Sequence, residues 1–324
     1  MSYKGDKHLY SVRNIIPKLV YVCNVLLLIF FMKYPREVLD AAKDGLMLWF
    51  DNVLPALLPF IAAVNILSAL GFVKLVSQWA GPFMGYVFKL PGAGGFALIT
   101  GLISGYPMGA KTVAEIWREG NITTKEAQRL LAFCNNAGPL FIVGVVGVGM
   151  LSSAAAGYAL WAGHIAAALV VGILTRGRGD KKYKDIHGYI LGRDTPSIGK
   201  VLGEAVKNAM DALVLVGGLI IFFSVVVRVV TIFLGHLPFI GLLAGAIEVT
   251  NGVRMLADGT LSPVKLAAIG GIIAFGGFSV HAQALHFTED TGIRAGVYLF
   301  HKALNGVIAA GVTWVIWWVY LLYN

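Results

Sequence analysis

Residues 100–150 read TGLISGYPMGAKTVAEIWREGNITTKEAQRLLAFCNNAGPLFIVGVVGVGM, and this stretch decides the fold. Its two apolar segments are interrupted by helix-breaking residues, SGYP at 104–107 and NNAGP at 135–139. In hydrocarbon every backbone N–H and C=O must be hydrogen-bonded, so non-helical backbone persists only where protein buries it or where it lines a wet cavity. Two such breaks close together are typical of a transporter binding site. The stretch therefore predicts a membrane carrier.

The composition places the whole chain in a membrane. Of 324 residues, 57% are hydrophobic and only 13% are charged, whereas soluble domains carry about 25% charged residues. The net charge of +9 falls largely in a few polar loops, as the positive-inside rule predicts. No basic face with interleaved aromatic residues is seen, so nucleic acid is not an expected partner. Cys23 and Cys134, both in apolar surroundings, predict neither a disulfide framework nor a metal site, and no cofactor is expected.

The N-terminal region, residues 1–45, is expected to hold a polar arm and a first transmembrane helix. A basic start precedes an apolar run over 19–32, which ends at KYPR without a small-residue cleavage site. This pattern favours an uncleaved helix over a signal peptide. Residues 36–45 are amphipathic and lead into a second span over 46–70.

Residues 46–175 are expected to form a first repeat. After the span over 46–70 come an interfacial helix over 72–90, a hairpin over 94–117, a broken helix over 126–151 and a span over 154–174. Each hairpin arm has roughly ten residues, about 15 Å at 1.5 Å per residue, which is half of a ~30 Å hydrocarbon core. The hairpin is therefore expected to enter and leave on one side of the membrane. The sequence TTKE at 123–126 predicts the capped start of the broken helix.

The second half, residues 201–324, repeats this order. A span over 206–230 precedes a hairpin over 238–257 with its break at TNG (250–252), a helix over 263–287 broken at 276–279, and a span over 296–322. LLAFCNNAGPLF (130–141) aligns with IIAFGGFSVHAQ (272–283). The linking loop, residues 176–200, has seven Lys/Arg against three Asp and is expected in the cytoplasm, as is the N-terminus. An odd number of crossings per repeat then makes the repeats inverted.

The predicted fold is an all-α polytopic membrane protein. It has two inverted repeats, each with a re-entrant helical hairpin and a broken transmembrane helix, and an extra N-terminal helix. Inverted repeats whose discontinuous helices meet at the midplane are a transporter architecture.

SGYPMGAKT, EAQRLLAFCNNAGPLFIVGVVGVGML and GEAVKNAMDALVLVGGLIIFFSVVVRVV together resemble the nucleoside-recognition gate-domain family, and within it the integral membrane proteins of sporulation. The resemblance covers roughly residues 45–318. That family is distantly similar to concentrative nucleoside transporters, whose two hairpins and two broken helices cradle the substrate. The resemblance implies movement of dipicolinate (pyridine-2,6-dicarboxylate) towards the forespore, and a location in the mother-cell-derived outer forespore membrane.

A planar dianion is recognised by helix N-termini and by cations. The polar residues at the breaks, with one cation beyond each hairpin tip, are therefore the candidate substrate-binding residues: Ser104, Tyr106, Lys111, Asn135, Asn136, Thr250, Asn251, Arg254 and Ser279. We expect Lys111 and Arg254 to face one shared cavity. The structural alternative is that Lys111 extends to the interface and Arg254 pairs with Glu248. Glu248, with His281 close by, is a candidate coupling group, although a lone histidine is more often structural.

Other functions remain open at this point. No motif of a hydrolase or complete phosphate-binding loop is present, so an enzyme is not expected. A nucleoside site would require neutral hydrogen-bonding groups and an aromatic stack. A non-transporting component of spore envelope assembly would not require polar helix breaks in inverted halves. The partners expected are a small solute, with a dicarboxylate such as dipicolinate favoured, and the lipid bilayer; formation of a homo-oligomer is undecided.

Overall fold

The computed structural model describes residues 6–177 and 197–323, which contain helices and no strand. The first half contains α1 (Asp6–Lys33), α2 (Pro35–Leu48), η1 (Trp49–Val53), α3 (Leu54–Ala69), α4 (Phe72–Phe83), η2 (Met84–Phe88), α5 (Ala93–Ser104), α6 (Met108–Arg118), α7 (Thr124–Cys134), η3 (Leu140–Met150) and α8 (Ala154–Leu174). The second half contains α9 (Ile198–Leu234), α10 (Ile240–Ile247), α11 (Val249–Ala257), α12 (Pro263–Phe275), α13 (Gly277–Phe287), η4 (Glu289–Thr291) and α14 (Ala295–Tyr323).

Five helical stretches of the described chain are long and apolar enough to cross a membrane: Pro35–Ala69, Ala154–Leu174, Ile198–Leu234, Pro263–Phe287 and Ala295–Tyr323. A sixth crossing is counted if Leu75–Phe88 and Ala93–Ser104, which meet at an angle of 91°, are taken together. The prediction of an all-α polytopic membrane protein is therefore confirmed.

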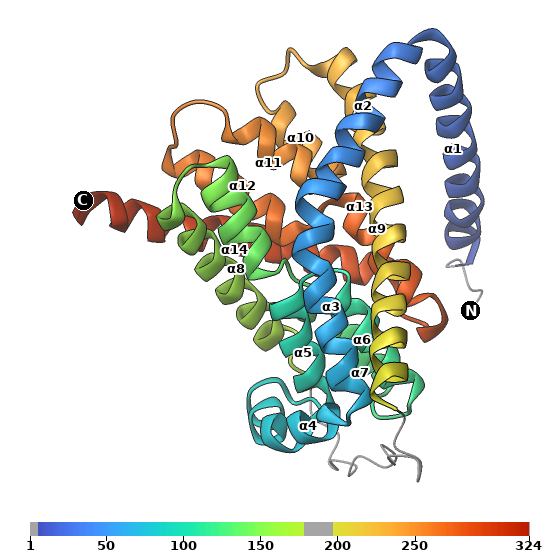
Figure 1. Ribbon diagram of the computed structural model, residues 1–324. Coiled ribbons are helices and arrows are strands. Elements are labelled where there is room, and N and C mark those ends of the chain that lie inside the picture. Colours follow the sequence, from blue (N-terminus) through green and yellow to red (C-terminus); the bar gives the residue numbers. More distant parts are fainter. Residues whose placement is uncertain (1–5, 178–196, 324) are drawn as a thin grey trace, which may run out of the picture.

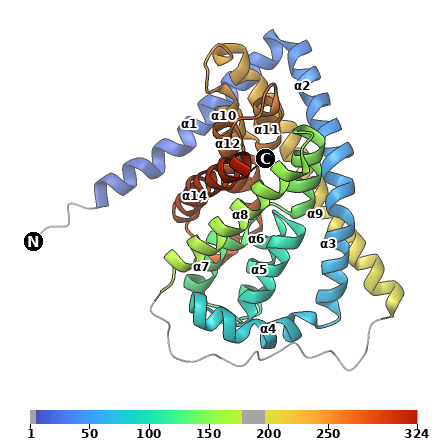
Figure 2. The same ribbon diagram turned by 90° about the vertical axis from the view of Figure 1, so that its left-hand side faces the viewer.

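The N-terminal region differs from the expectation in one respect. The span expected over 46–70 begins at Pro35, because α2, η1 and α3 follow one another as one stretch of 35 residues. A Cβ at Gly45 would lie 2.9 Å from the backbone of Ile221, so α2 packs closely on α9 through this glycine. Helix α1 extends away from the other helices (Figure 2), and its apolar part Val20–Lys33 is shorter than the five candidate spans. That α1 crosses the membrane stays a prediction.

Two helical hairpins lie at opposite ends of the molecule. α5 and α6 occupy its lower part in Figure 1, whereas α10 and α11 occupy its upper part. The first hairpin turns at residues 105–107 and includes a cis Tyr106–Pro107 peptide bond. The second turns at Glu248, whose backbone is extended (φ −140°, ψ 115°).

The predicted break at Thr250, Asn251 and Gly252 is therefore wrong, since all three residues are helical in α11. The Glu248 carboxylate accepts a hydrogen bond from the backbone N–H of Asn251 and thereby caps the N-terminus of α11. Because Glu248 caps the helix, α11 has already begun when the chain reaches the TNG sequence at 250–252, which had suggested a turn.

Two helices are interrupted within the core. The first interruption separates α7, ending at Cys134, from η3, beginning at Leu140. The second is a single residue, Gly276, whose φ of 97° favours glycine because it has no Cβ. The order of long helix, hairpin, broken helix and long helix thus occurs in both halves. How the halves face the two sides of a membrane stays a prediction, and most of the basic 176–200 loop lies outside the described residues.

Candidate functional site

Residues of both hairpin tips and of both broken helices line one cavity at the centre of the molecule. The cavity measures about 40 Å³ and is closed on its remaining sides by η1, α3 and α9. Its lining residues come from both hairpin tips, both broken helices and these three elements: Asn52, Val53, Ala56, Leu57, Gly105, Tyr106, Gly138, Phe141, Val216, Ile220, Glu248, Val249, Thr250, Ser279, Val280 and Gln283. This volume admits roughly three water molecules. A solute of more than a few heavy atoms does not fit the cavity at this size.

Polar groups in this central cavity lie on three of the interrupted segments. Glu248 is 1% exposed, and its Oε2 accepts hydrogen bonds from Asn251 N at 2.8 Å and Asn251 Nδ2 at 2.9 Å. The Tyr106 hydroxyl, Ser279 Oγ and Gln283 Oε1 are buried without a hydrogen-bond partner among the described residues. These three atoms can hydrogen-bond a polar solute, and the carboxylate can exchange a proton with it. Of the predicted residues, Tyr106, Thr250, Ser279 and Glu248 are brought together in this cavity.

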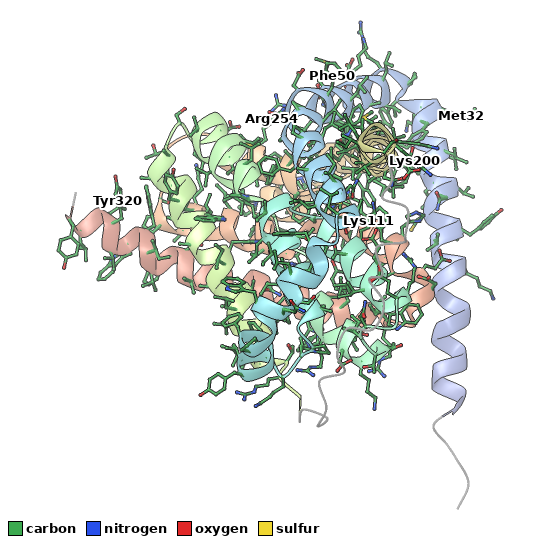
Figure 3. The ribbon with its side chains drawn as sticks, turned by 60° about the horizontal axis from the view of Figure 1, so that its bottom comes forward. Met32, Phe50, Lys111, Lys200, Arg254 and Tyr320 are labelled. Atoms are coloured by element: carbon green, nitrogen blue, oxygen red, sulfur yellow. The ribbon has the colours of Figure 1, made fainter. Side chains whose placement is uncertain are left out.

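Lys111 and Arg254 do not share the central cavity, so the predicted dicationic site is not found. Lys111 lines a separate polar cavity of about 360 Å³ and lies 3.8 Å from Glu115. Arg254 is exposed and lines a third cavity of about 290 Å³ beside Asp258. Figure 3 shows the two side chains apart on different helices. The reason is helical rise: at ~1.5 Å per residue each cation lies ~6–9 Å beyond its hairpin tip, and the two hairpins extend to opposite ends.

The barriers between the three cavities are unequal. Ile61, Met108 and Leu213 form a fully buried apolar cluster on α3, α6 and α9. Along α3 this cluster lies between Leu57, which lines the central cavity, and Asn65, which lines the Lys111 cavity. On the other side, Asn52 lines both the central cavity and the Arg254 cavity. The central cavity is therefore separated from the Lys111 cavity by an apolar layer, and it adjoins the Arg254 cavity at one amide side chain.

The break in the first broken helix contacts α14 through a second polar cluster. Asn135 Nδ2 donates to the Tyr298 hydroxyl at 2.9 Å, and His281 Nδ1 lies 3.2 Å from the same hydroxyl. Lys302 Nζ donates to the main-chain oxygen of Asn135 at 2.8 Å. His281 therefore contacts Tyr298, and its expected proximity to Glu248 is not reflected in a hydrogen bond among the described residues.

The remaining predicted residues have mainly structural contacts. Asn136 Nδ2 donates to Phe133 O at 2.6 Å, which satisfies a carbonyl at the end of α7. Asn251 Nδ2 also donates to Ser224 Oγ at 2.9 Å and so joins the second hairpin to α9. Ser104 is buried, and its hydroxyl has no hydrogen-bond partner among the described residues.

Several polar residues of these clusters were not among the sequence candidates. Lys302 and Asn305 lie in α14, where both are 1% exposed. A signal was present, because an ionisable residue inside an apolar span marks a functional site by default. Their spacing of three also predicts one helix face. Gln283 carried no such signal, since it lies near the end of its helix among histidines.

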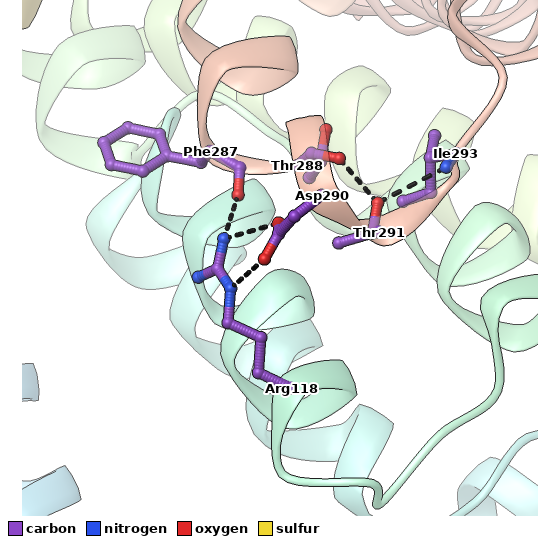
Figure 4. Close-up of polar contacts among 6 residues, drawn as sticks. All are labelled: Arg118, Phe287, Thr288, Asp290, Thr291 and Ile293. Carbon is purple, nitrogen blue, oxygen red and sulfur yellow. Dashed lines mark hydrogen bonds and ion pairs between the residues drawn. The ribbon is translucent and has the colours of Figure 1, made fainter.

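A charged contact joins the two halves of the chain. It lies between the C-terminal end of α6, in the first hairpin, and the loop that precedes α14. Arg118, at the end of α6, donates from Nε and Nη2 to the two carboxylate oxygens of Asp290 at 2.7 and 2.8 Å, and from Nη2 to Phe287 O at 2.9 Å (Figure 4). The Asp290 loop is held further by Thr291 Oγ1, which donates to Thr288 O at 2.6 Å. The hydrogen bonds from Arg118 hold the pKa of the Asp290 carboxyl below its usual range. Because a depressed pKa stabilises the contact above the ordinary pKa, the contact persists at neutral pH and is lost only as pH falls through the depressed value.

We expect Arg118→Ala to release this contact and to accelerate amide hydrogen exchange over residues 287–293. Arg118→Lys should accelerate it partly, because a single ammonium group cannot reproduce the planar fork. Exchange measured by mass spectrometry on the purified protein tests this, with the exposed Arg176→Ala as a control of equal charge change. Unchanged exchange in Arg118→Ala would show that the contact does not hold the loop.

Comparisons with known proteins agree with this architecture. A family model described as Gate, nucleoside recognition, matches residues 50–190. The sporulation integral membrane protein YlbJ of Bacillus subtilis (strain 168) is 34% identical over an alignment of 323 positions, and this alignment covers 88% of this chain and 79% of the relative. No solved structure matches. The identity and coverage show that the chain belongs to the family of the sporulation integral membrane protein YlbJ.

Proposed function

We propose that the protein is a carrier that moves a small polar solute through its central cavity. The observation that carries this proposal is that both hairpin tips and both broken helices border one buried space. Interrupted helices at membrane depth are tolerated where they line such a space. Carriers use this arrangement to expose one site alternately to either side. A scaffold or assembly component has no need of it.

We propose dipicolinate as the solute, moved towards the forespore across the outer forespore membrane. The relative's role in sporulation and the resemblance noted above support this assignment. A cation lies in each outer cavity, Lys111 in one and Arg254 in the other, where each would attract an anion towards the centre. Inside the central cavity a solute carboxylate would meet Glu248. Two carboxylates in one buried site share a proton, so we propose that one proton accompanies the dianion.

A neutral heterocycle such as a nucleoside is the second candidate. No Lys or Arg is among the residues that line the central cavity, while Tyr106 and Phe141 offer aromatic surfaces. The description of the matching family model as nucleoside recognition also favours this class.

Uptake into proteoliposomes distinguishes these candidates. We expect purified protein to accumulate labelled dipicolinate faster than protein-free vesicles do, with faster uptake when the outside is more acidic. Unlabelled dipicolinate should compete, whereas uridine should not. Competition by uridine alone would assign the nucleoside class instead. The absence of uptake of either solute would contradict the carrier proposal and favour a non-transporting role.

A further inference from the structure

The first helix break holds a buried ammonium group that the proposed solute site does not use. Lys302, on α14, is 1% exposed, and its Nζ donates to the main-chain oxygen of Asn135 at 2.8 Å. Asn135 directly follows Cys134, the last residue of α7. The ammonium group therefore lies at the carbonyl end of a helix that stops inside the molecule.

Among the described residues no ion pair joins Lys302 to an acid. A buried, unpaired charge is costly, so the compensation must come from the helix end. The last carbonyls of a helix lack partners within the helix, and they carry about half a negative charge.

Two carbonyls at this helix end accept hydrogen bonds from side chains. Asn305 Nδ2 donates to Ala132 O at 2.8 Å, and Asn136 Nδ2 donates to Phe133 O at 2.6 Å. The Cys134 oxygen points towards Gly101, where a Cβ would lie only 1.7 Å from it. The Asn135 oxygen accepts from Lys302. In transporters, carbonyls at such half-helix ends are the ligands that hold a coupling Na⁺ or proton.

The second helix break is closed differently. Gly276, in the left-handed conformation, donates its own N–H to Ile272 O at 2.8 Å. This turn gives one carbonyl in the last turn of α12 a backbone partner. Among the described residues no Lys or Arg side chain donates to that helix end. The cation is therefore specific to the first break and is not a general requirement of a broken helix.

We propose that Lys302 is a tethered cation that takes the place of a coupling Na⁺ at the carbonyl end of α7. The chain then binds and moves its solute without Na⁺. The part concerning movement rests on the proposed carrier function, whereas the part concerning the cation site does not.

Thermal unfolding of the purified, detergent-solubilised protein tests the cation site without any solute. We expect the wild-type Tm to be equal in NaCl and in choline chloride. Lys302→Ala should lower the Tm by roughly 5 °C in choline chloride, because Asn135 O loses its donor. Na⁺ or methylammonium should then restore at least half of the loss in a saturable manner, because either fits the space that the side chain leaves.

Two control variants sharpen the result. Lys302→Met should lower the Tm without any rescue, because the methionine side chain fills the space and carries no charge. Lys207→Ala removes an exposed lysine of α9 and should respond to neither salt. A wild-type Tm or uptake rate that rises with Na⁺ would overturn the proposal, even if Lys302→Ala fails to fold. A folded Lys302→Ala that no small cation stabilises would overturn it as well. Absence of uptake with the expected Tm pattern would instead reject only the carrier function.

Discussion

Glu248→Gln is expected to lower the initial rate of dipicolinate uptake by roughly thirtyfold or more. Removing one partner of a buried, charge-assisted contact typically costs about 2–5 kcal/mol, at about 1.4 kcal/mol per tenfold change. Glutamine keeps the side-chain length and one acceptor oxygen for Asn251, so the cap of α11 should be preserved. The amide cannot take up the proton that the proposed mechanism moves. Initial rates in proteoliposomes, normalised to protein content, provide the measurement.

The dependence of uptake on pH separates this role from a purely structural one. The residual uptake of Glu248→Gln should no longer respond to an imposed pH gradient, whereas the wild type should. Glu248→Ala should in addition lose the cap and unfold more readily by about 1 kcal/mol. Wild-type uptake and gradient dependence in a well-folded Glu248→Gln protein would exclude Glu248 as the coupling group.

Gly101→Ala is expected to destabilise the protein more than an alanine substitution at any other described glycine, because its added Cβ would make the shortest contact. A Cβ at Gly101 would lie 1.7 Å from the main-chain oxygen of Cys134, and one at Gly109 would lie 2.0 Å from the same atom. Both arms of the first hairpin thus touch the end of α7 through glycine. Adding atoms to a packed interior costs about 1–3 kcal/mol and occasionally more, and the obstacle here is backbone and not a mobile side chain. We expect a cost at or above the upper end of that range.

Thermal unfolding of detergent-solubilised Gly101→Ala and Gly109→Ala provides the measurement. Gly218→Ala is the matched control, because Gly218 lies in the interior of α9 with no atom within 4 Å of its added Cβ. That control should stabilise the protein by up to about 1 kcal/mol through helix propensity. An unchanged Tm in Gly101→Ala would mean that the hairpin does not pack against α7 as described.

The sequence predicted the fold class because its signals were local. Apolar length specifies spans, and the glycine, proline and asparagine residues at 105–107, 135–139 and 276 weaken a helix wherever it is placed. The tip of the second hairpin was predicted wrongly because a small and polar TNG suggested a turn. The deciding interaction was the cap that Glu248 provides to Asn251, which depends on side-chain geometry.

The candidate site was predicted only in part, because orientation across elements is not local. Tyr106, Glu248 and Ser279 reach one cavity since each lies at or within a turn of a break. Lys111 and Arg254 were expected to meet because both follow a tip, but a helix carries successive residues away from its end. Two hairpins that arrive from opposite ends therefore separate these cations. Lys302 belongs to a third element, α14, and its contact with Asn135 depends on long-range packing.

The unequal barriers around the central cavity have a consequence for the rates of solute exchange. In the proposed carrier, a solute leaving past Ile61, Met108 and Leu213 would have to part a buried apolar contact, whereas one leaving past Asn52 would displace a polar side chain. Parting buried apolar surface costs about 25 cal/mol per Å² exposed to water. The two exits thus differ in activation energy even when the solute has the same free energy on both sides. In the proposed carrier the central cavity would therefore exchange solute faster, in both directions, through the Asn52 side than through the other, so the unequal barriers would set the rates of exchange and not the direction of net movement.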